Sequence, residues 1–290
     1  MSEPLLKTIL RLFAVVAKVD EVTHQERDQI RTFLEDHLSR QAVETYLKLF
    51  DEYVQTLPPK SGDLSDEQQR LRELCQEVAA ELTQRQKVVI LVEIMAIIQA
   101  DANVSSREVE LTEFIASSFK ISNRETEAIK TFVLGHESRQ LDHESLLVVD
   151  SSKANSFLKA RHIYRSHLDG FVAVLYLDES EIYFLKYFGG SDVYLNGVPV
   201  KSGKIAVLAV GSTLRWDKDE PVYYGDLLNQ FKRFGDYPRL SFEGKNISFR
   251  FKNGRLGLRD VNVIEESGNL IALMGASGAG KSTLLHVLNG

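Results

Sequence analysis

The sequence is poor in cysteine and contains no apolar run long enough to cross a membrane. Its one cysteine, Cys75, allows neither an internal disulfide nor a thiolate metal cage, which fits a reducing compartment. The longest apolar stretch, residues 88–98, is interrupted by Glu93 and is far shorter than the roughly 20 residues that a spanning helix needs. The N-terminus also lacks a basic segment followed by an apolar one, so we predict no signal peptide.

An excess of positive charge is absent as well. Residues 1–140 contain 17 Lys and Arg against 24 Asp and Glu, a net −7, whereas residues 141–290 contain 18 against 17, a net +1. Neither half is basic enough to predict a nucleic-acid surface. With 43% hydrophobic and 26% charged residues, the composition is that of an ordinary globular protein, and 290 residues suggest more than one domain.

The first half of the chain has helical periodicity. Apolar residues recur at i, i+3 and i+4, and at five places a Ser or Thr that opens such a segment is followed three residues later by Glu or Gln. These capping boxes begin at Thr23, Ser65, Thr83, Ser105 and Ser122. We predict helices over residues 4–19, 23–38, 41–57, 65–81, 84–100, 105–120 and 122–136, with a loop at 58–63.

An internal repeat relates the two parts of this helical half. Residues 19–26 align with residues 101–108, and each copy is an acidic turn followed by a capped helix. The arrangement resembles the TerB-like helical domain of tellurite resistance proteins, whose turn reads Ala-Asp-Gly-x-Val and precedes Ser/Thr-x-x-Glu. Ala100 and Asp101 match this turn, whereas the first copy has Val19 at the Asp position and its carboxylate at Asp20. The resemblance implies an all-α bundle over residues 1–140.

The acidic residues of the two turns have two interpretations. Asp20, Glu26, Asp101 and Glu108 are oxygen ligands of the kind that hard cations prefer, and the family resemblance allows a weak metal site. Alternatively, Glu26 and Glu108 are the acids of capping boxes and the aspartates close turns. We favour the capping interpretation, and Asp101 with Glu108 is the pair retained as a candidate metal site.

Residues 145–235 change to the period of two that is typical of strands. Val, Tyr, Phe and Leu are frequent, and Asn196-Gly197 is a strong hairpin signal. The predicted strands are residues 146–150, 171–177, 181–187, 192–195, 198–200, 205–209 and 213–216. Many short strands at close spacing predict a β-sandwich.

The segment from Asp192 to Leu214 is similar to the second half of a forkhead-associated (FHA) domain. The resemblance covers about 90 residues and implies recognition of phosphothreonine through a Gly-Arg and a Ser-x-x-His. In this sequence Lys159-Ala-Arg161 lacks the glycine, and Ser166-His167 lacks the spacing. We therefore expect a packing or docking module rather than a phosphopeptide-binding one.

The last 50 residues carry the chemical signal. Alternating residues over 240–251 and 258–264 predict a hairpin, and residues 270–274 predict a short buried strand. The loop that follows has the Walker A pattern Gly-x-x-x-x-Gly-Lys-Ser: Gly275, Ala276, Ser277, Gly278, Ala279, Gly280, Lys281, Ser282 and Thr283. Such a loop surrounds phosphate oxygens with backbone amides at a helix N-terminus, while Lys281 faces the β and γ phosphates and Ser282 faces Mg²⁺.

The flanks of this loop resemble the start of an ABC-transporter nucleotide-binding domain. The resemblance rests on Phe249-Arg-Phe251, Leu258-Arg-Asp-Val, Glu266-Ser-Gly268 and residues 270–285. It implies ATP and Mg²⁺ as cofactors, a transmembrane domain in the same or a separate chain, a second ATPase domain, and a location at the cytoplasmic face of the membrane. Phe251 stands where the family stacks an aromatic ring on adenine, although a core role in the strand is equally compatible.

The glutamine loop, signature motif, Walker B acids and switch histidine of that family do not follow before Gly290. We expect the chain to be the N-terminal piece of a longer ABC-type ATPase and not to hydrolyse ATP by itself. The alternatives are a soluble P-loop ATPase of stress response or signalling, and a non-catalytic interaction scaffold. The predicted fold is multidomain: an all-α bundle over residues 1–140, an FHA-like β-sandwich over 145–235 and a truncated P-loop α/β segment over 238–290.

Overall fold

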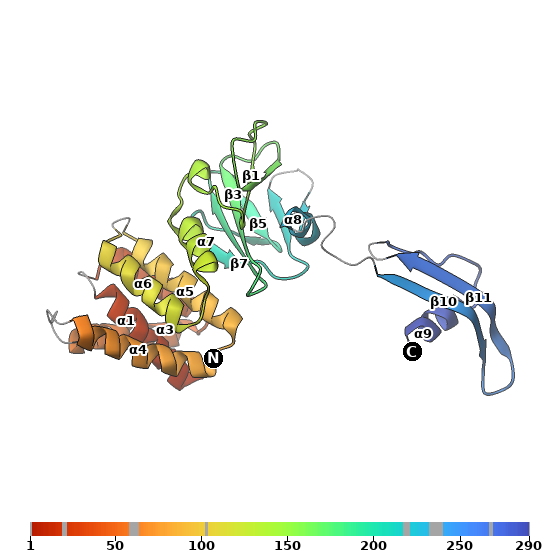
Figure 1. The fold of residues 1–290 in the computed structure, drawn as a ribbon, viewed down its shortest axis with the longest axis horizontal. Coiled ribbons are helices and arrows are strands. Elements are labelled where there is room, and N and C mark those ends of the chain that lie inside the picture. The colour runs from red at the N-terminus through yellow and green to blue at the C-terminus, as the bar shows by residue number, and fades with distance from the viewer. Residues whose placement is uncertain are drawn as a thin grey trace. The chain divides into compact units, whose positions relative to one another are not determined.

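The computed structural model describes residues 2–18, 22–57, 64–101, 104–216, 221–231, 240–266 and 269–289, without the side chains of residues 64–68. The chain divides into two compact units, Met1–Phe231 and Lys232–Gly290. The first unit holds the predicted helices and two β-sheets, and the second holds a hairpin followed by one helix (Figure 1). None of the described helices combines the length and the apolar character that a bilayer-spanning segment requires.

The helices that the sequence predicts are present in the described part of residues 1–140. Their bounds are α1 Glu3–Ala17, α2 His24–Glu35, α3 Arg40–Thr56, α4 Leu64–Glu81, α5 Gln84–Gln99, α6 Ser106–Ser118 and α7 Asn123–Leu134. The capping boxes at Thr23, Thr83 and Ser105 are confirmed, because in each both reciprocal hydrogen bonds are present. The predicted loop at 58–63 lies outside the described residues. The predicted box at Ser65 lies where the structure describes the backbone but not the side chains.

The predicted box at Ser122 forms only in part. The Ser122 hydroxyl accepts a hydrogen bond from the Glu125 amide, as a cap should. The Glu125 carboxylate, however, accepts hydrogen bonds from the amide (3.0 Å) and the hydroxyl (2.8 Å) of Ser180 instead. A long-range partner has therefore replaced the local one.

The internal repeat is visible in the burial of equivalent helices. Helix α2 buries Glu26, Ile30, Phe33 and Leu34, and helix α6 buries the residues that stand 82 positions later: Glu108, Thr112, Ile115 and Ala116. The next helix of each copy begins after a serine N-cap, Ser39 for α3 and Ser122 for α7, which stand 83 positions apart. The helices α1–α2–α3 and α5–α6–α7 are thus two copies of one packing unit.

Two sheets follow the helices. One has the strand order β2-β1-β3-β4-β7 and the other the order β6-β5-β8-β9, and β1 with β2 is the parallel pair among the described strands. The bounds are β1 Leu146–Asp150, β2 Arg161–Tyr164, β3 Phe171–Leu177, β4 Ile182–Phe188, β5 Val193–Leu195, β6 Val198–Pro199, β7 Ile205–Val207, β8 Thr213–Trp216 and β9 Val222–Tyr223, followed by helix α8, Tyr224–Phe231. The sequence reading missed β2, β9 and α8.

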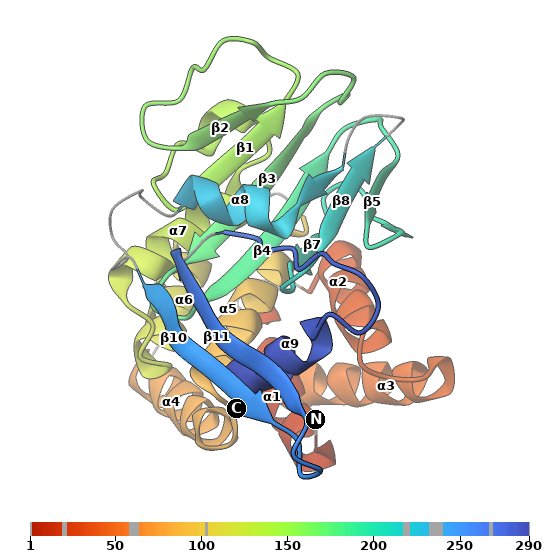
Figure 2. The same ribbon diagram turned by 90° about the vertical axis from the view of Figure 1, so that its right-hand side faces the viewer.

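The larger sheet is buried on both faces. One face shares a core with the smaller sheet, including Val149, Val174 and Trp216, so the two sheets form a sandwich. The opposite face, including Val148 and Leu175, belongs to the same hydrophobic core as the helices. Helix α7 contacts β3, and Figure 1 shows β1 and β3 between the helices and β5 of the smaller sheet. Figure 2 views the same unit from the other direction, with helix α8 turned toward the viewer. A continuous apolar run such as Phe-Val-Ala-Val-Leu in β3 is what a doubly covered strand requires.

The second unit consists of the antiparallel pair β10 (Ser241–Arg250) and β11 (Leu256–Glu266) and of helix α9 (Lys281–Asn289). The predicted buried strand over residues 270–274 is wrong. These residues have no strand structure, Leu270 is fully exposed and Met274 is 88% exposed. A strand needs a neighbour for its backbone hydrogen bonds, and the described residues supply none beside this segment.

Candidate functional site

The loop before helix α9 is shaped by glycine. Gly278 and Gly280 have φ values of 82° and 88°, a conformation that other residues rarely adopt. The Ala279 amide donates to the Ala276 carbonyl at 3.2 Å, which closes a turn, and the Leu284 amide donates to Gly280 at 2.9 Å as the first helical bond. The chain therefore leaves the loop directly into a helix.

Helix α9 begins at Lys281, and the ammonium group of that residue turns back over the loop. Its Nζ donates to the carbonyls of Gly275 at 2.7 Å and Ala276 at 2.8 Å. The first amides of any α-helix lack partners within the helix and attract anions. A cation and a helix N-terminus thus meet at one loop.

A hollow of about 330 Å³ lies between this loop and the hairpin of the second unit. It is lined by Phe251, Arg255, Leu256 and Gly257 from the hairpin and by residues 277–283 from the loop and helix. The structure therefore brings Phe251 together with most of the predicted loop residues, although 26 positions separate Phe251 from Ser277 in the sequence.

The ring of Phe251 forms part of the wall of this hollow. It is 41% exposed and packs edge-to-face against Phe249, with 5.1 Å between ring centroids. Gly257 makes room for it, because a Cβ at that position would come within 2.7 Å of the ring. One side of the ring is thus supported while the residue stays accessible.

Arg255 is a lining residue that sequence reasoning missed. It follows the Asn253-Gly254 turn, and its carbonyl accepts a hydrogen bond from the Phe251 amide at 2.9 Å. Together with Lys281 it gives the described lining of the hollow two cationic side chains. The available signal was the hairpin turn, which returns residue 255 to the side of residue 251.

The candidate metal ligands of the helical region have structural partners. The Glu26 and Glu108 carboxylates each accept hydrogen bonds from the amide and hydroxyl of their own N-cap residue, at 2.7–2.9 Å. Burial raises the pKa of Glu26, and the nearby charges of Asp101 and Glu108 add to this effect. Asp20 lies outside the described residues, and within them no group of three or more His, Cys, Asp or Glu side chains is placed to hold a metal ion.

The residues considered for phosphothreonine recognition are engaged inside the β region. The Arg161 guanidinium donates to the carbonyls of Gln230 and Glu144 and lies over the Phe231 ring, 4.9 Å from its centroid. The Ser166 carbonyl accepts a hydrogen bond from the Trp216 indole at 3.5 Å. Arg161 thereby holds helix α8 against the larger sheet.

Comparison with protein families matches two separate segments of the chain. Residues 7–131 match the family model of tellurite resistance protein TerB, which confirms the resemblance of the helical region. Residues 258–290 match the family model of the ABC transporter. Each match covers less than half of the chain.

Curated relatives of the chain match it over short stretches. The chain is 49% identical over 47 residues to the phosphonates import ATP-binding protein PhnC 1 of Halalkalibacterium halodurans, covering 16% of the chain and 18% of the relative. It is 48% identical over 51 residues to the phosphonates import ATP-binding protein PhnC of Lactococcus lactis subsp. cremoris, covering 18% of the chain and 20% of the relative. It is 38% identical over 72 residues to the beta-(1-->2)glucan export ATP-binding/permease protein NdvA of Agrobacterium vitis, covering 25% and 11%.

These relatives support an ABC-transporter-related ATP-binding region over a small part of the chain. The chain spans at most about a fifth of the length of the three relatives. No solved structure matches the chain.

Proposed function

We propose that residues 238–290 bind MgATP as the opening part of an ABC-type ATPase domain. The observation that carries this proposal is that a glycine loop, a helix N-terminus, Lys281 and an accessible aromatic ring line one hollow. The match of residues 258–290 to ABC transporters supports the same assignment.

In this proposal the amides of residues 278–282 bind phosphate oxygens. The Lys281 ammonium exchanges the carbonyls of Gly275 and Ala276 for the β and γ phosphates, since a charged oxygen is the stronger acceptor. Phe251 stacks on adenine, and Arg255 adds a second positive charge beside the phosphates or ribose.

Ser282 is the residue that would hold Mg²⁺. It is exposed in the first turn of helix α9, on the lining of the same hollow, and a hydroxyl oxygen is a ligand that Mg²⁺ accepts. The ion, when bound, neutralises charge on the phosphates. Positioning the phosphates is then the contribution of this loop.

The role proposed for the first unit is regulation or docking. The domains would be the helical bundle over residues 1–140, an FHA-like sandwich over 145–235 and the ATPase segment from 238. The whole protein would act at the cytoplasmic face of the membrane with a transmembrane domain and a second ATPase domain, and would couple MgATP hydrolysis to transport.

The test is nucleotide binding by the 290-residue chain, followed by the fluorescence of a labelled ATP analogue. We expect Lys281→Ala to lower affinity at least about tenfold, because a charge-assisted contact to phosphate is lost. Phe251→Ala should lower affinity for ATP but not for inorganic triphosphate, and Phe242→Ala, at an exposed position of β10 outside the lining of the hollow, is the matched control. Equal affinity of the original chain and Lys281→Ala would refute the proposal.

A second candidate is a P-loop ATPase of stress response without a transport role. The TerB match favours it, since that match covers more of the chain than the ABC match does. Fractionation of cells that contain the full protein separates the two candidates. A transporter ATPase should sediment with membranes together with an integral membrane partner, whereas an ATPase without a transport role should not.

A further inference from the structure

A hollow of about 450 Å³ opens on the surface of the helical bundle between α1, α3 and α4. Helix α1 contacts both of the other helices, and its residues Ala14 and Val15 lie at the hollow with exposures of 0% and 8%. Helices α3 and α4 supply the remaining lining residues. We call this hollow the α1–α3–α4 groove.

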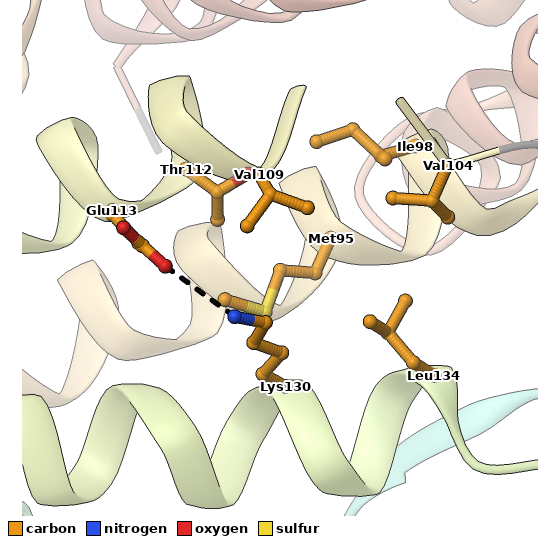
Figure 3. A pocket seen from close by; sticks show the side chains of 8 residues that line it. All are labelled: Met95, Ile98, Val104, Val109, Thr112, Glu113, Lys130 and Leu134. Atoms are coloured by element: carbon orange, nitrogen blue, oxygen red, sulfur yellow. Dashed lines mark hydrogen bonds and ion pairs between the residues drawn. The ribbon is translucent and has the colours of Figure 1, made fainter. Parts of the chain in front are cut away.

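Size distinguishes this groove from an apolar space elsewhere in the bundle. Figure 3 shows that space, where side chains such as Met95, Thr112 and Lys130 approach one another from α5, α6 and α7. It has a volume of about 20 Å³, which is room for about one water molecule. The α1–α3–α4 groove, in contrast, is within the range of volumes in which proteins hold organic groups.

The lining of the groove combines apolar residues with charged ones. Besides Ala14 and Val15, the half-buried Leu57 and Leu74 contribute apolar surface. The charged residues of the lining are all exposed: Arg11, Arg70, Glu73 and Glu77. Apolar contact surface bordered by exposed polar groups is typical of the interfaces between proteins.

The cations at this border are accessible to a partner. The Arg11 guanidinium lies over the Tyr53 ring, 5.2 Å from its centroid, so the aromatic ring keeps it at the groove. Within the described part of the chain, neither Arg11 nor Arg70 forms an ion pair with a carboxylate. A carboxylate that enters from outside therefore gains a guanidinium contact without displacing an existing one.

The internal repeat shows what covers the equivalent face of the second copy. An offset of 82 residues between α1 and α5 relates Arg11 to Glu93, and the offset of 83 between α3 and α7 relates Tyr53 to His136. The His136 ring packs edge-to-face against Phe188 of β4, with 5.6 Å between ring centroids. The β region thus covers this face.

A charged residue of the β region accompanies this aromatic contact. Burial raises the pKa of Glu93, and the positive charge of Lys204 opposes the rise, so Lys204 lies close to Glu93. The next residue, Ile205, packs against the core that the helices share with the larger sheet. Since the first copy has Arg11 at the position of Glu93, an occupant of its groove needs a negative charge at this point.

We propose that the α1–α3–α4 groove docks a segment of another protein, which places an apolar side chain on Ala14 and Val15 and a carboxylate on Arg11. The apolar side chain takes the role that Phe188 and Ile205 have in the second copy, and the carboxylate takes the role of Lys204. The groove has room for a few side chains. One copy of the repeat would thus hold the β region of the same chain, and the other would recruit a partner.

The test uses a peptide with the sequence of residues 201–207 in which Lys201→Glu and Lys204→Glu reverse the charge, and the natural peptide as its control. The full chain carries ¹³C-methyl alanine as the reporter. We expect the acidic peptide to shift the Ala14 methyl signal saturably, half-complete at about 1 mM, because a few side chains bury little area. The signal of Ala96, the counterpart of Ala14 in the second copy, should stay in place.

The natural lysine peptide should bind at least about threefold more weakly, the range expected for an exposed ion pair. Residues 1–140 have a net charge of −7, so non-specific attraction favours the lysine peptide and a preference for the acidic one reports the local contact. An Ala14 signal that does not move with the acidic peptide up to about 10 mM, or that moves equally with both peptides, refutes the proposal.

Reversing the charge of the groove tests the role of Arg11 directly. Arg11→Glu changes an exposed residue, so folding should be preserved, and we expect the variant to bind the lysine peptide more tightly than the acidic one. Lys48→Glu, at an exposed position of α3 outside the lining, makes the same change in net charge and should keep the original preference. An unchanged preference in folded Arg11→Glu would overturn the assignment of Arg11 as the charged contact.

Discussion

Apolar residues have different surroundings in the two units of this protein. Every residue of β3 is buried or nearly so, since the sheet has helices on one face and a second sheet on the other. In the second unit, Phe242 and Ile264 are 50% and 61% exposed, and the apolar residues 270–274 form no strand. Apolar sequence is thus sufficient to predict a strand only where a partner is available to cover it.

The largest test of this contrast is truncation within the first unit. Because the helices share one hydrophobic core with the larger sheet, residues 1–140 alone should expose apolar surface and melt at least about 10 °C below residues 1–231. Removal of residues 232–290 should leave the melting of the first unit unchanged. Circular dichroism of the three chains measures both effects.

The capping boxes and apolar spacing of residues 1–140 predict that this region folds independently. The truncation therefore tests whether the helices are stable alone or depend on the core that they share with the larger sheet. A cooperative melt of residues 1–140 at the temperature of residues 1–231 would show that the sheet adds nothing to the stability of the helices.

A pair of core substitutions gives the next largest effect. Leu175→Ala in β3 removes a fully buried side chain and should lower the free energy of unfolding by about 2–5 kcal/mol. Ile264→Ala in β11, at 61% exposure, should change it by no more than about 0.5 kcal/mol. Denaturant unfolding measures both, and similar losses at the two sites would contradict the contrast in burial.

Sequence reasoning succeeded for elements that local patterns determine and failed for elements that distant contacts stabilise. Helix positions were predicted to within a few residues because caps such as Thr23 with Glu26 and apolar spacing are local. Strand β2 and helix α8 were missed because distant contacts stabilise them, including the bond from Arg161 to the Gln230 carbonyl. No local pattern encodes such a pairing.

The residues of the candidate site also differ in how far the sequence predicts them. The loop over residues 275–283 was recognisable from its spacing alone, since glycines and Lys281 stand in one short segment. Arg255 was not, because only the register of the β10–β11 hairpin carries it to the hollow.

The hydrogen bonds of Glu125 offer a smaller test of the contact between helices and sheet. Glu125→Ala leaves the amide and hydroxyl of buried Ser180 without their acceptor and should cost about 3 kcal/mol. Glu127→Ala, two residues further along α7 and exposed, is the matched control. Equal melting temperatures of the two variants would show that the Ser180 contact contributes little.

The smallest expected effect is a dependence of stability on pH that arises at Glu93 in helix α5. Burial raises the pKa of Glu93 to about 7, and nearby Asp36 adds to the rise, whereas Gln29 and Lys204 oppose it. Lys204 also pairs with Asp36, at 2.9 Å and 3.0 Å, so the β region contributes to this environment.

A folded-state pKa above the ordinary value means that the folded protein binds more protons than the unfolded chain between about pH 4.5 and pH 7. Stability should therefore fall as the pH rises through this window, by an amount of order 2 kcal/mol. Glu93→Gln removes the titration, so its melting temperature should exceed that of the original chain at pH 8 and approach it at pH 5. Glu110→Gln, at an exposed position of α6, should follow the original chain at both values. A melting temperature of Glu93→Gln that tracks the original chain across the window would mean that Glu93 ionises in the folded protein as freely as an exposed carboxylate does.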